Sequence, residues 1–255
     1  MNPSLVGSEM CIRDSNGDAN DSNEPLGGVL DQWRDKSGAS RHAGNGKGPD
    51  LNVGRWNGLS TLSFDGLTQY LRVSDSSVFN FGEDATIFLV AKGDTLSDWR
   101  PILSKLGEDN VGWQFRKDNT DFATFTVRGT TGNDGQRGGA LVNGETHVWS
   151  MRKSKLKRTQ WADGNEEYDI DDRGAVPATT SDLVIGARDQ NGITAFGGVE
   201  IGEILIFDSA LSDLQIFQMQ GHLAHKWGLS TGMANEHPYK NCLLYTSPSP
   251  RDSDS

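Results

Sequence analysis

The chain has 255 residues, a formal net charge of −11 and scattered basic residues. Because nucleic-acid binding depends on clustered lysines and arginines, this composition argues against a nucleic-acid partner. No apolar run approaches the roughly 18 residues of a membrane-spanning helix, so a membrane span is not expected. The length suits one large domain, and all-β sandwiches often reach this size. The one basic cluster, residues 152–158, lies between two strand-like runs and is interpreted as a solvated hairpin tip.

The two ends of the chain resemble a translated DNA sequencing adapter. Residues 10–15 can be encoded by ATG TGT ATA AGA GAC AG plus one base, and the reverse complement, extended by the upstream AG, encodes residues 242–247. The outer residues on both sides match the rest of one transposase-type adapter in the same way. We therefore expect residues 1–15 and 242–255 to be non-biological, which makes the chain a metagenomic fragment, and we exclude them from fold reasoning. The expected natural domain is residues 16–241, and it contains neither of the two cysteines.

Short apolar runs broken by Gly, Asn and Asp recur along the natural part, as in antiparallel β proteins. Residues 59–64 end at an Asp65-Gly66 turn signal, and residues 69–73 form the expected return strand. Residues 85–92 are apolar on both faces, which predicts a central strand covered on both sides. Further strands are expected at residues 101–106, 112–116, 122–128, 146–152, 156–162, 183–186 and 199–207.

One helix is expected after the last strand. Residues 209–212 offer an N-terminal cap, the apolar residues of 211–227 recur near helical spacing, and Gly228 suits the end of the helix. We expect its apolar face to lie against the edge of the sandwich. The predicted fold class is all-β, with two packed antiparallel sheets and one C-terminal α-helix in a single domain.

Three stretches resemble a known family. Residues 31–38 (DQWRDKSG) resemble its W-x-D-x-S-G opening, and residues 62–71 resemble its F-D-G…Y-L hairpin. Residues 202–239, from GEILIFD through HLAHKWGL to HPY, resemble its C-terminal strand, helix and tail. The chain is thus similar to laminin-G-like jelly-roll sandwiches of the concanavalin A-like lectin/glucanase superfamily from environmental bacteria. This resemblance implies an extracellular or cell-surface module of a larger protein that binds glycans or matrix and surface proteins.

Members of the family normally begin with a strand that ends in L-D-A before the tryptophan motif. Residues 18–21 look like the end of that segment, and the strand itself would lie where the adapter begins. We therefore expect the domain to be truncated at its N-terminal strand. Truncation would leave unpaired backbone groups on a neighbouring strand, which favours aggregation.

Strand alternation places polar side chains on the outside of the predicted sandwich. In residues 112–116 the tryptophan and phenylalanine would point into the core, leaving Gln114 and Arg116 outward. Arg128 and Arg152 would also point outward, so neighbouring strands would form one polar face with three arginines. The paired N–H donors of a guanidinium match the oxygens of carboxylates and sulfates. The more specific hypothesis is therefore an anionic glycan ligand, and the alternative is an ordinary solvated sheet face. A tryptophan in a polar turn could stack on a sugar ring. The predicted ligand-binding residues are Trp99, Gln114, Arg116, Arg128 and Arg152.

Catalysis is not expected, although the superfamily includes glycoside hydrolases. Those enzymes need two carboxylates on one strand face. The nearest candidates, Glu167, Asp169 and Asp171, share one face by alternation. They lack the hydrolases' Glu-x-Asp-x-x-Glu order, because Asp172 stands where the second Glu should be. The leading hypothesis is a non-catalytic carbohydrate-binding or adhesion module, and the alternatives are a structural adhesion spacer and a glycoside hydrolase.

No cofactor is required by these residues, but calcium is a candidate. Calcium takes several oxygen ligands from carboxylates and backbone carbonyls. Acidic and amide residues crowd the segment 18–23, and a second group lies in a loop near residue 134. The candidate ligands are Asp18, Asp21 and Asp134.

Overall fold

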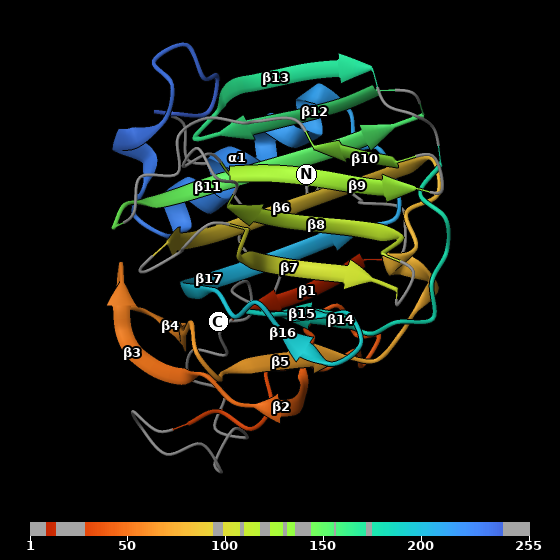
Figure 1. Cartoon of the computed structure of the whole chain (residues 1–255). Helices are drawn as coiled ribbons and strands as arrows, with labels where there is room; N and C mark the ends of the chain where they lie inside the picture. The colour runs from red at the N-terminus through yellow and green to blue at the C-terminus, as the bar shows by residue number, and fades with distance from the viewer. Residues whose placement is uncertain are drawn as a thin grey trace, which may run out of the picture.

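The computed structural model describes residues 9–13, 29–93, 99–107, 110–117, 123–129, 132–135, 144–155, 157–171 and 175–241. Two large antiparallel sheets lie face to face, and a single long helix lies on the outside of one of them (Figure 1). The predicted all-β sandwich with a C-terminal helix is confirmed. Within the described residues, no helix has the length and apolar character needed to span a bilayer.

The first sheet has eight strands. They are β1 (Glu9–Arg13), β3 (Asp50–Trp56), β4 (Leu59–Asp65), β6 (Asp84–Gly93), β11 (Thr146–Ser154), β12 (Lys157–Ala162), β13 (Asn165–Asp171) and β17 (Gly198–Phe207). Their order is β13-β12-β11-β6-β17-β4-β3. On the side away from β6, β4 pairs with residues 198–201 of β17 and β1 pairs with residues 203–207. A segment expected to be adapter-derived thus forms an edge strand beside β17.

The second sheet has seven strands. They are β2 (Gly44–Lys47), β5 (Tyr70–Val73), β7 (Pro101–Leu106), β8 (Gly112–Lys117), β9 (Ala123–Gly129), β10 (Gly132–Gly135) and β14 (Leu183–Ile185). Their order is β10-β9-β8-β7-β14-β5-β2. A small hairpin of β15 (Arg188–Asp189) and β16 (Ile193–Thr194) lies in front of β14 in the view of Figure 1. Two short 3-10 helices, Ser77–Phe79 and Ser230–Gly232, complete the fold.

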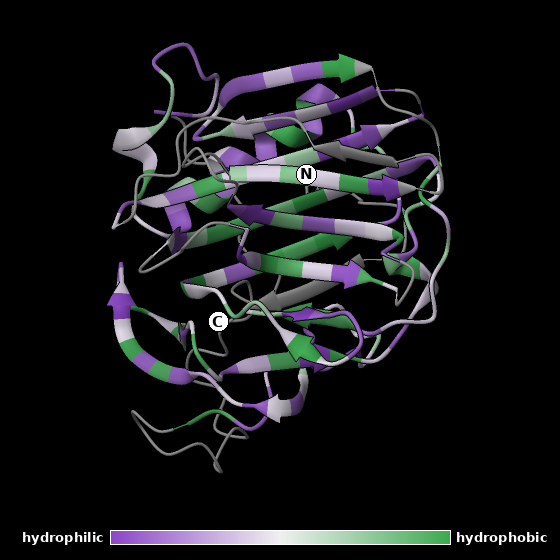
Figure 2. Cartoon of the chain, viewed as in Figure 1, coloured by the Kyte–Doolittle hydropathy of each residue, from purple (hydrophilic) through white to green (hydrophobic). Residues whose placement is uncertain are grey.

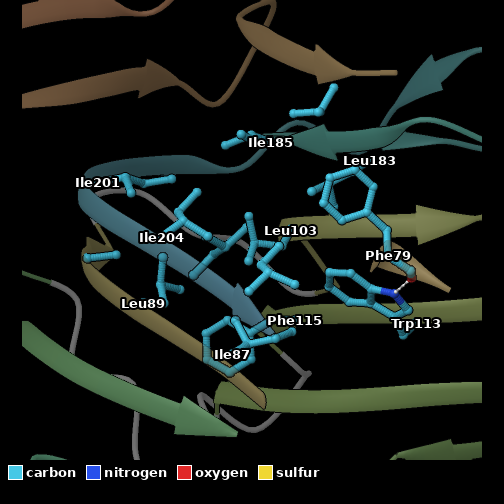
Figure 3. Packing of buried hydrophobic residues seen from close by; sticks show 14 of the residues in the cluster. Phe79, Ile87, Leu89, Leu103, Trp113, Phe115, Leu183, Ile185, Ile201 and Ile204 are labelled. Carbon is cyan, nitrogen blue, oxygen red and sulfur yellow. Dashed lines mark hydrogen bonds between the residues drawn. The ribbon is translucent and has the colours of Figure 1, made fainter. Parts of the chain in front are cut away.

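The main core lies between the sheets, because alternate residues of each strand point inward. Trp113 and Phe115 of β8 are buried against Ile87 and Leu89 of β6 (Figure 3). The indole Nε1 of Trp113 donates a hydrogen bond of 2.8 Å to the backbone carbonyl of Phe79. The predicted inward alternation of β8, β9 and β11 is confirmed by the burial of their aromatic and aliphatic residues.

A second core lies on the other face of the eight-stranded sheet, under α1 (Asp213–Lys226). Phe88 and Val90 of β6 face this helix, so the prediction of a central strand covered on both sides is confirmed. A capping box begins the helix, with reciprocal bonds between Ser212 and Gln215. The helix covers a sheet face rather than the expected sandwich edge, because apolar residues of β6, β11, β12 and β17 continue onto that face.

The family-like motifs build this fold. Asp65, at the end of β4, accepts hydrogen bonds from the backbone N–H groups of Leu67, Thr68 and Gln69 and from the Thr68 hydroxyl. Burial alone would raise the pKa of Asp65, but these bonds outweigh it and hold the pKa well below its usual range. The turn between β4 and β5 is therefore organised by one carboxylate.

The C-terminal motif is organised by Glu203, which is 2% exposed. Its carboxylate accepts hydrogen bonds from the indole of Trp227 at 2.8 Å and from the amine of Lys226 at 2.6 Å. The neighbouring Gly202 leaves room for the indole, because a Cβ there would lie 2.8 Å from a ring carbon of Trp227. These contacts tie the end of α1 to β17.

The basic cluster of residues 152–158 forms the predicted hairpin between β11 and β12. Its expected solvation is wrong for two residues, because Lys153 and Arg158 are completely buried. Both point inward by alternation, and the amine of Lys153 donates to the backbone carbonyl of Lys155 at 2.7 Å. The charges of this hairpin therefore do not form one exposed basic patch.

Candidate functional site

Four arginines gather on the outer face of the seven-stranded sheet, the face turned toward the viewer in Figure 1. Hydrophilic and hydrophobic residues alternate along β8 and β9 (Figure 2), and the inward ones fill the core. Arg116 and Arg128 are outward residues of β8 and β9, Arg100 directly precedes β7, and Arg188 lies on β15. We call these four residues the arginine surface.

A layer of polar side chains supports the arginine surface. Gln114 lies between Ser104 and Thr126 across three paired strands. Its amide donates to the Ser104 hydroxyl at 3.0 Å, and its oxygen accepts from a terminal nitrogen of Arg116 at 3.4 Å. The sequence placed Gln114 outward, but it is only 1% exposed. It therefore holds Arg116 in place instead of forming an open ligand-binding surface.

Two arginines of this surface keep their positive charge uncompensated. Arg128 donates to the neutral amide oxygen of Asn110, and within the described part of the chain no carboxylate pairs with Arg128 or Arg188. Burial lowers the pKa of both guanidiniums. The positive charge of Arg188 lowers the pKa of Arg128 further, and the positive charge of Arg100 lowers the pKa of Arg188 further. The Nε atoms of Arg128 and Arg188 are buried without a hydrogen-bond partner among the described residues. A bound anion would relieve the repulsion between these neighbouring positive charges.

Trp99 lies beside the arginine surface. Its side chain is 45% exposed, and the guanidinium carbon of Arg116 lies 4.7 Å from its ring centroid. Its backbone φ is +62°, a conformation in which a bulky residue is strained. An exposed aromatic ring held next to cationic groups can stack on the apolar face of a sugar.

The structure separates Arg152 from the other predicted ligand residues. The sequence grouped it with Arg116 and Arg128, but β11 belongs to the eight-stranded sheet. There Arg152 donates to Asp213 at 2.5 Å and to the carbonyl of Leu211 at 3.1 Å, so it holds the start of α1. The grouping was wrong because alternation gives the face of a strand and not the sheet to which it belongs.

Besides Arg100, which directly precedes β7, Arg188 is a member of the arginine surface that the sequence reasoning missed. It stands on a strand of two residues, too short for an alternation pattern. The Asn191-Gly192 pair between β15 and β16 is a turn signal that could have indicated a hairpin there. Only the return of this hairpin over β7 brings Arg188 to Arg128.

The candidate calcium ligands lie mostly outside the described residues. Asp18 and Asp21 fall outside them. Asp134 lies in β10 and is described only by its backbone, which pairs with Val127 of β9. Within the described part of the chain, no group of three or more His, Cys, Asp or Glu residues could hold a metal ion. Calcium binding stays a prediction.

The acidic strand β13 divides its carboxylates among separate contacts. A register shift in its pairing with β12 falls at Glu167, whose pKa is raised by burial and by the charge of Asp163. Both oxygens of Asp163 are engaged, one with His147 Nδ1 at 2.6 Å and one with the N–H of Val148 at 2.8 Å. Asp169 accepts from the Thr159 hydroxyl at 3.1 Å. The side chain of Asp171 lies outside the described residues.

Several solved structures are similar to this chain. The binding domain of Paraclostridial Mosquitocidal Protein 1 matches with a TM-score of 0.62 and 12% identity, over 77% of this chain and 51% of that one. A botulinum neurotoxin type C structure matches with a TM-score of 0.58 and 14% identity, over 80% and 52%. The ligand-binding domain of botulinum neurotoxin serotype D, in complex with N-acetylneuraminic acid, matches with a TM-score of 0.61 and 11% identity, over 83% and 50%.

These structures establish similarity of fold, and the chain spans about half of their length. Comparison with curated proteins found no match. A family model described as Laminin_G_3, concanavalin A-like lectin/glucanases superfamily, matches residues 64–217, which is more than half of the chain. The matched range runs from the end of β4 into α1 and includes the whole arginine surface. The chain belongs to this laminin-G-like family of the concanavalin A-like superfamily.

Proposed function

We propose that this domain is a non-catalytic, extracellular module that binds an anionic glycan at the arginine surface. The observation that supports the proposal is the pair of uncompensated guanidiniums, Arg128 and Arg188, on the outer face of a chain whose net charge is −11. A local positive potential on an acidic protein favours anions at that place. Arg188 is half-buried and close enough to Arg100 to feel its charge, and the exposed Trp99 directly precedes Arg100. These two residues offer the ligand a charge and an aromatic ring.

Two of the similar proteins interact with a ganglioside or with a sugar. Cell entry of botulinum neurotoxin type C depends on interaction with two ganglioside molecules, and the serotype D domain was solved with N-acetylneuraminic acid. The low identity limits this comparison to the fold, so the proposal for this chain depends on its own arginines.

Binding of sulfated and carboxylated polysaccharides, measured by calorimetry against neutral polysaccharides, tests the proposal. Hydrogen bonds to charged groups contribute about 1.5–3 kcal/mol, so Arg188→Gln is expected to weaken binding about tenfold or more. Arg55→Gln is the matched control, because Arg55 is a 55% exposed arginine on β3 of the other sheet. Raising the salt concentration is expected to weaken binding by screening.

The alternatives predict different results. If the domain binds no sulfated and no carboxylated polysaccharide, the proposal is wrong and the adhesion spacer is favoured. Release of reducing sugar from a bound polysaccharide would favour the glycoside hydrolase. Equal losses in Arg188→Gln and Arg55→Gln would show that only the overall charge matters, which contradicts a site at the arginine surface.

A further inference from the structure

A polar pocket of about 690 Å³ lies next to the arginine surface, on the same outer face of the seven-stranded sheet. Its volume is within the range of pockets that bind small molecules. The loop before β14, the β15 strand, β5 and the β7–β8 turn supply its walls. Its lining includes Arg72, Gly107, Ala178, Ser181, Asp182 and Asp189.

The charge of this pocket differs from that of the arginine surface. Arg72 is the one arginine among the described residues that line it, and a terminal nitrogen of Arg72 lies 2.7 Å from the carboxylate of Asp189. The other terminal nitrogen lies 3.4 Å from the carboxylate of Asp182. Lys105, which donates to the carbonyls of Thr179 and Ser181, is paired with Asp75. Among the described lining residues two carboxylates thus face one guanidinium, which leaves a net negative charge for an entering anion. The pocket instead offers acceptors for hydroxyl groups, which suits a neutral sugar.

The pocket and the arginine surface share two walls. Arg188 and Asp189 are consecutive residues of β15, and Arg188 belongs to the arginine surface while Asp189 lines the pocket. At the β7–β8 turn, Arg128 donates to Asn110, whose N–H donates to the carbonyl of Gly107 at 2.9 Å. Gly107 lines the pocket. One ligand of two or more sugar residues can therefore contact both places.

From this arrangement we infer that the ligand is a polysaccharide in which an anionic residue adjoins a neutral one. The anionic residue lies on the arginine surface, and the neutral residue enters the pocket beside Asp182 and Asp189. This inference rests on the proposed function, since it divides the same binding face into an anion-binding part and a neutral part.

Two pairs of probes separate the pattern of charge from its amount. Hyaluronan oligosaccharides alternate a uronate with a neutral N-acetylhexosamine, whereas oligogalacturonate carries a carboxylate on every residue. Oligosaccharides of κ-carrageenan alternate a sulfated galactose with a neutral sugar, whereas dextran sulfate is sulfated throughout. We expect at least one alternating probe to bind about tenfold more tightly than its uniformly charged counterpart, as measured by calorimetry.

Ala178→Tyr tests the pocket without changing any charge, because Ala178 is exposed and lines it. This variant is expected to weaken the alternating probe about tenfold and to leave the uniformly charged probe unchanged. Ala39→Tyr, at an exposed alanine outside the pocket lining, is the matched control. Melting temperatures of both variants establish that they fold.

The outcomes distinguish the inference from the function on which it rests. If all anionic probes bind equally well, and Arg188→Gln weakens them while Ala178→Tyr does not, the inference is wrong and the anionic-glycan function stands. If no anionic probe binds, both fail. Tighter binding of an alternating probe, lost in Ala178→Tyr, supports the inference.

Discussion

Replacement of Glu203 is expected to be among the most destabilising single changes outside the apolar core. Glu203→Ala removes the shared acceptor of Trp227 and Lys226. Breaking a buried ion pair by removing one partner costs about 3–5 kcal/mol. Lys226 is 22% exposed and can recover some hydration, so the lower value, about 3 kcal/mol, applies. For a domain of this size each kcal/mol lowers the melting temperature by about 2–4 °C, which gives a loss of about 6–12 °C by calorimetry.

Two further variants test the cause of this loss. Glu203→Gln keeps an acceptor for the indole of Trp227 but loses the ion pair, and is expected to cost about 1 kcal/mol. Glu236→Ala is the control, because Glu236 is exposed and such changes usually stay within about 0.5 kcal/mol. A Glu203→Ala variant that melts within a degree of the unmodified protein would refute the reasoning. It would show that the indole N–H of Trp227 can lose its buried acceptor without any loss of stability.

Three other perturbations have defined outcomes. Gly202→Ala places a Cβ 2.8 Å from the Trp227 ring and is expected to cost about 1–3 kcal/mol in urea unfolding, whereas an unchanged midpoint would contradict this close approach. Burial lowers the pKa of His147, but the hydrogen bond and charge of Asp163 outweigh it and raise the pKa above its usual 6.5. The stabilisation of the fold by the protonated His147 is therefore complete below pH 6.5 and is lost as the pH rises through the raised pKa. His147→Gln should remove this part of the pH dependence of the melting temperature. Deletion of residues 1–13 leaves residues 203–207 of β17 without their β1 partner and should increase aggregation, measured by light scattering. Equal scattering of the two proteins would show that β1 does not protect this edge of β17.

The sequence was sufficient to predict the sandwich because local periodicity reports which side of a strand is buried. Trp113 and Phe115 alternate with polar residues and fill the core, and the doubly apolar β6 lies between two cores. The cap expected within residues 209–212 is formed by Ser212, at the start of the helix. These features depend on neighbours in sequence, so a single chain contains the information.

The arginine surface could be predicted only in part, because it depends on contacts between distant segments. Arg116 and Arg128 were found by alternation, but Arg152 has the same pattern on the other sheet. Arg188 reaches the site through a short hairpin that no periodicity reports. The near-complete burial of Gln114 was equally hidden, since it reflects the side chains around it and the paired strands on both sides.

The motifs by which the family is recognised and the residues proposed to bind a ligand are different sets. Asp65 organises a turn, and Glu203 ties a helix to a strand, so these motif residues are occupied by the fold. Trp99, Arg128 and Arg188 lie outside the three motif stretches, on a face where no carboxylate among the described residues pairs with either arginine. Membership of the family therefore establishes the sandwich, whereas the ligand must be determined from the arginine surface and the pocket beside it.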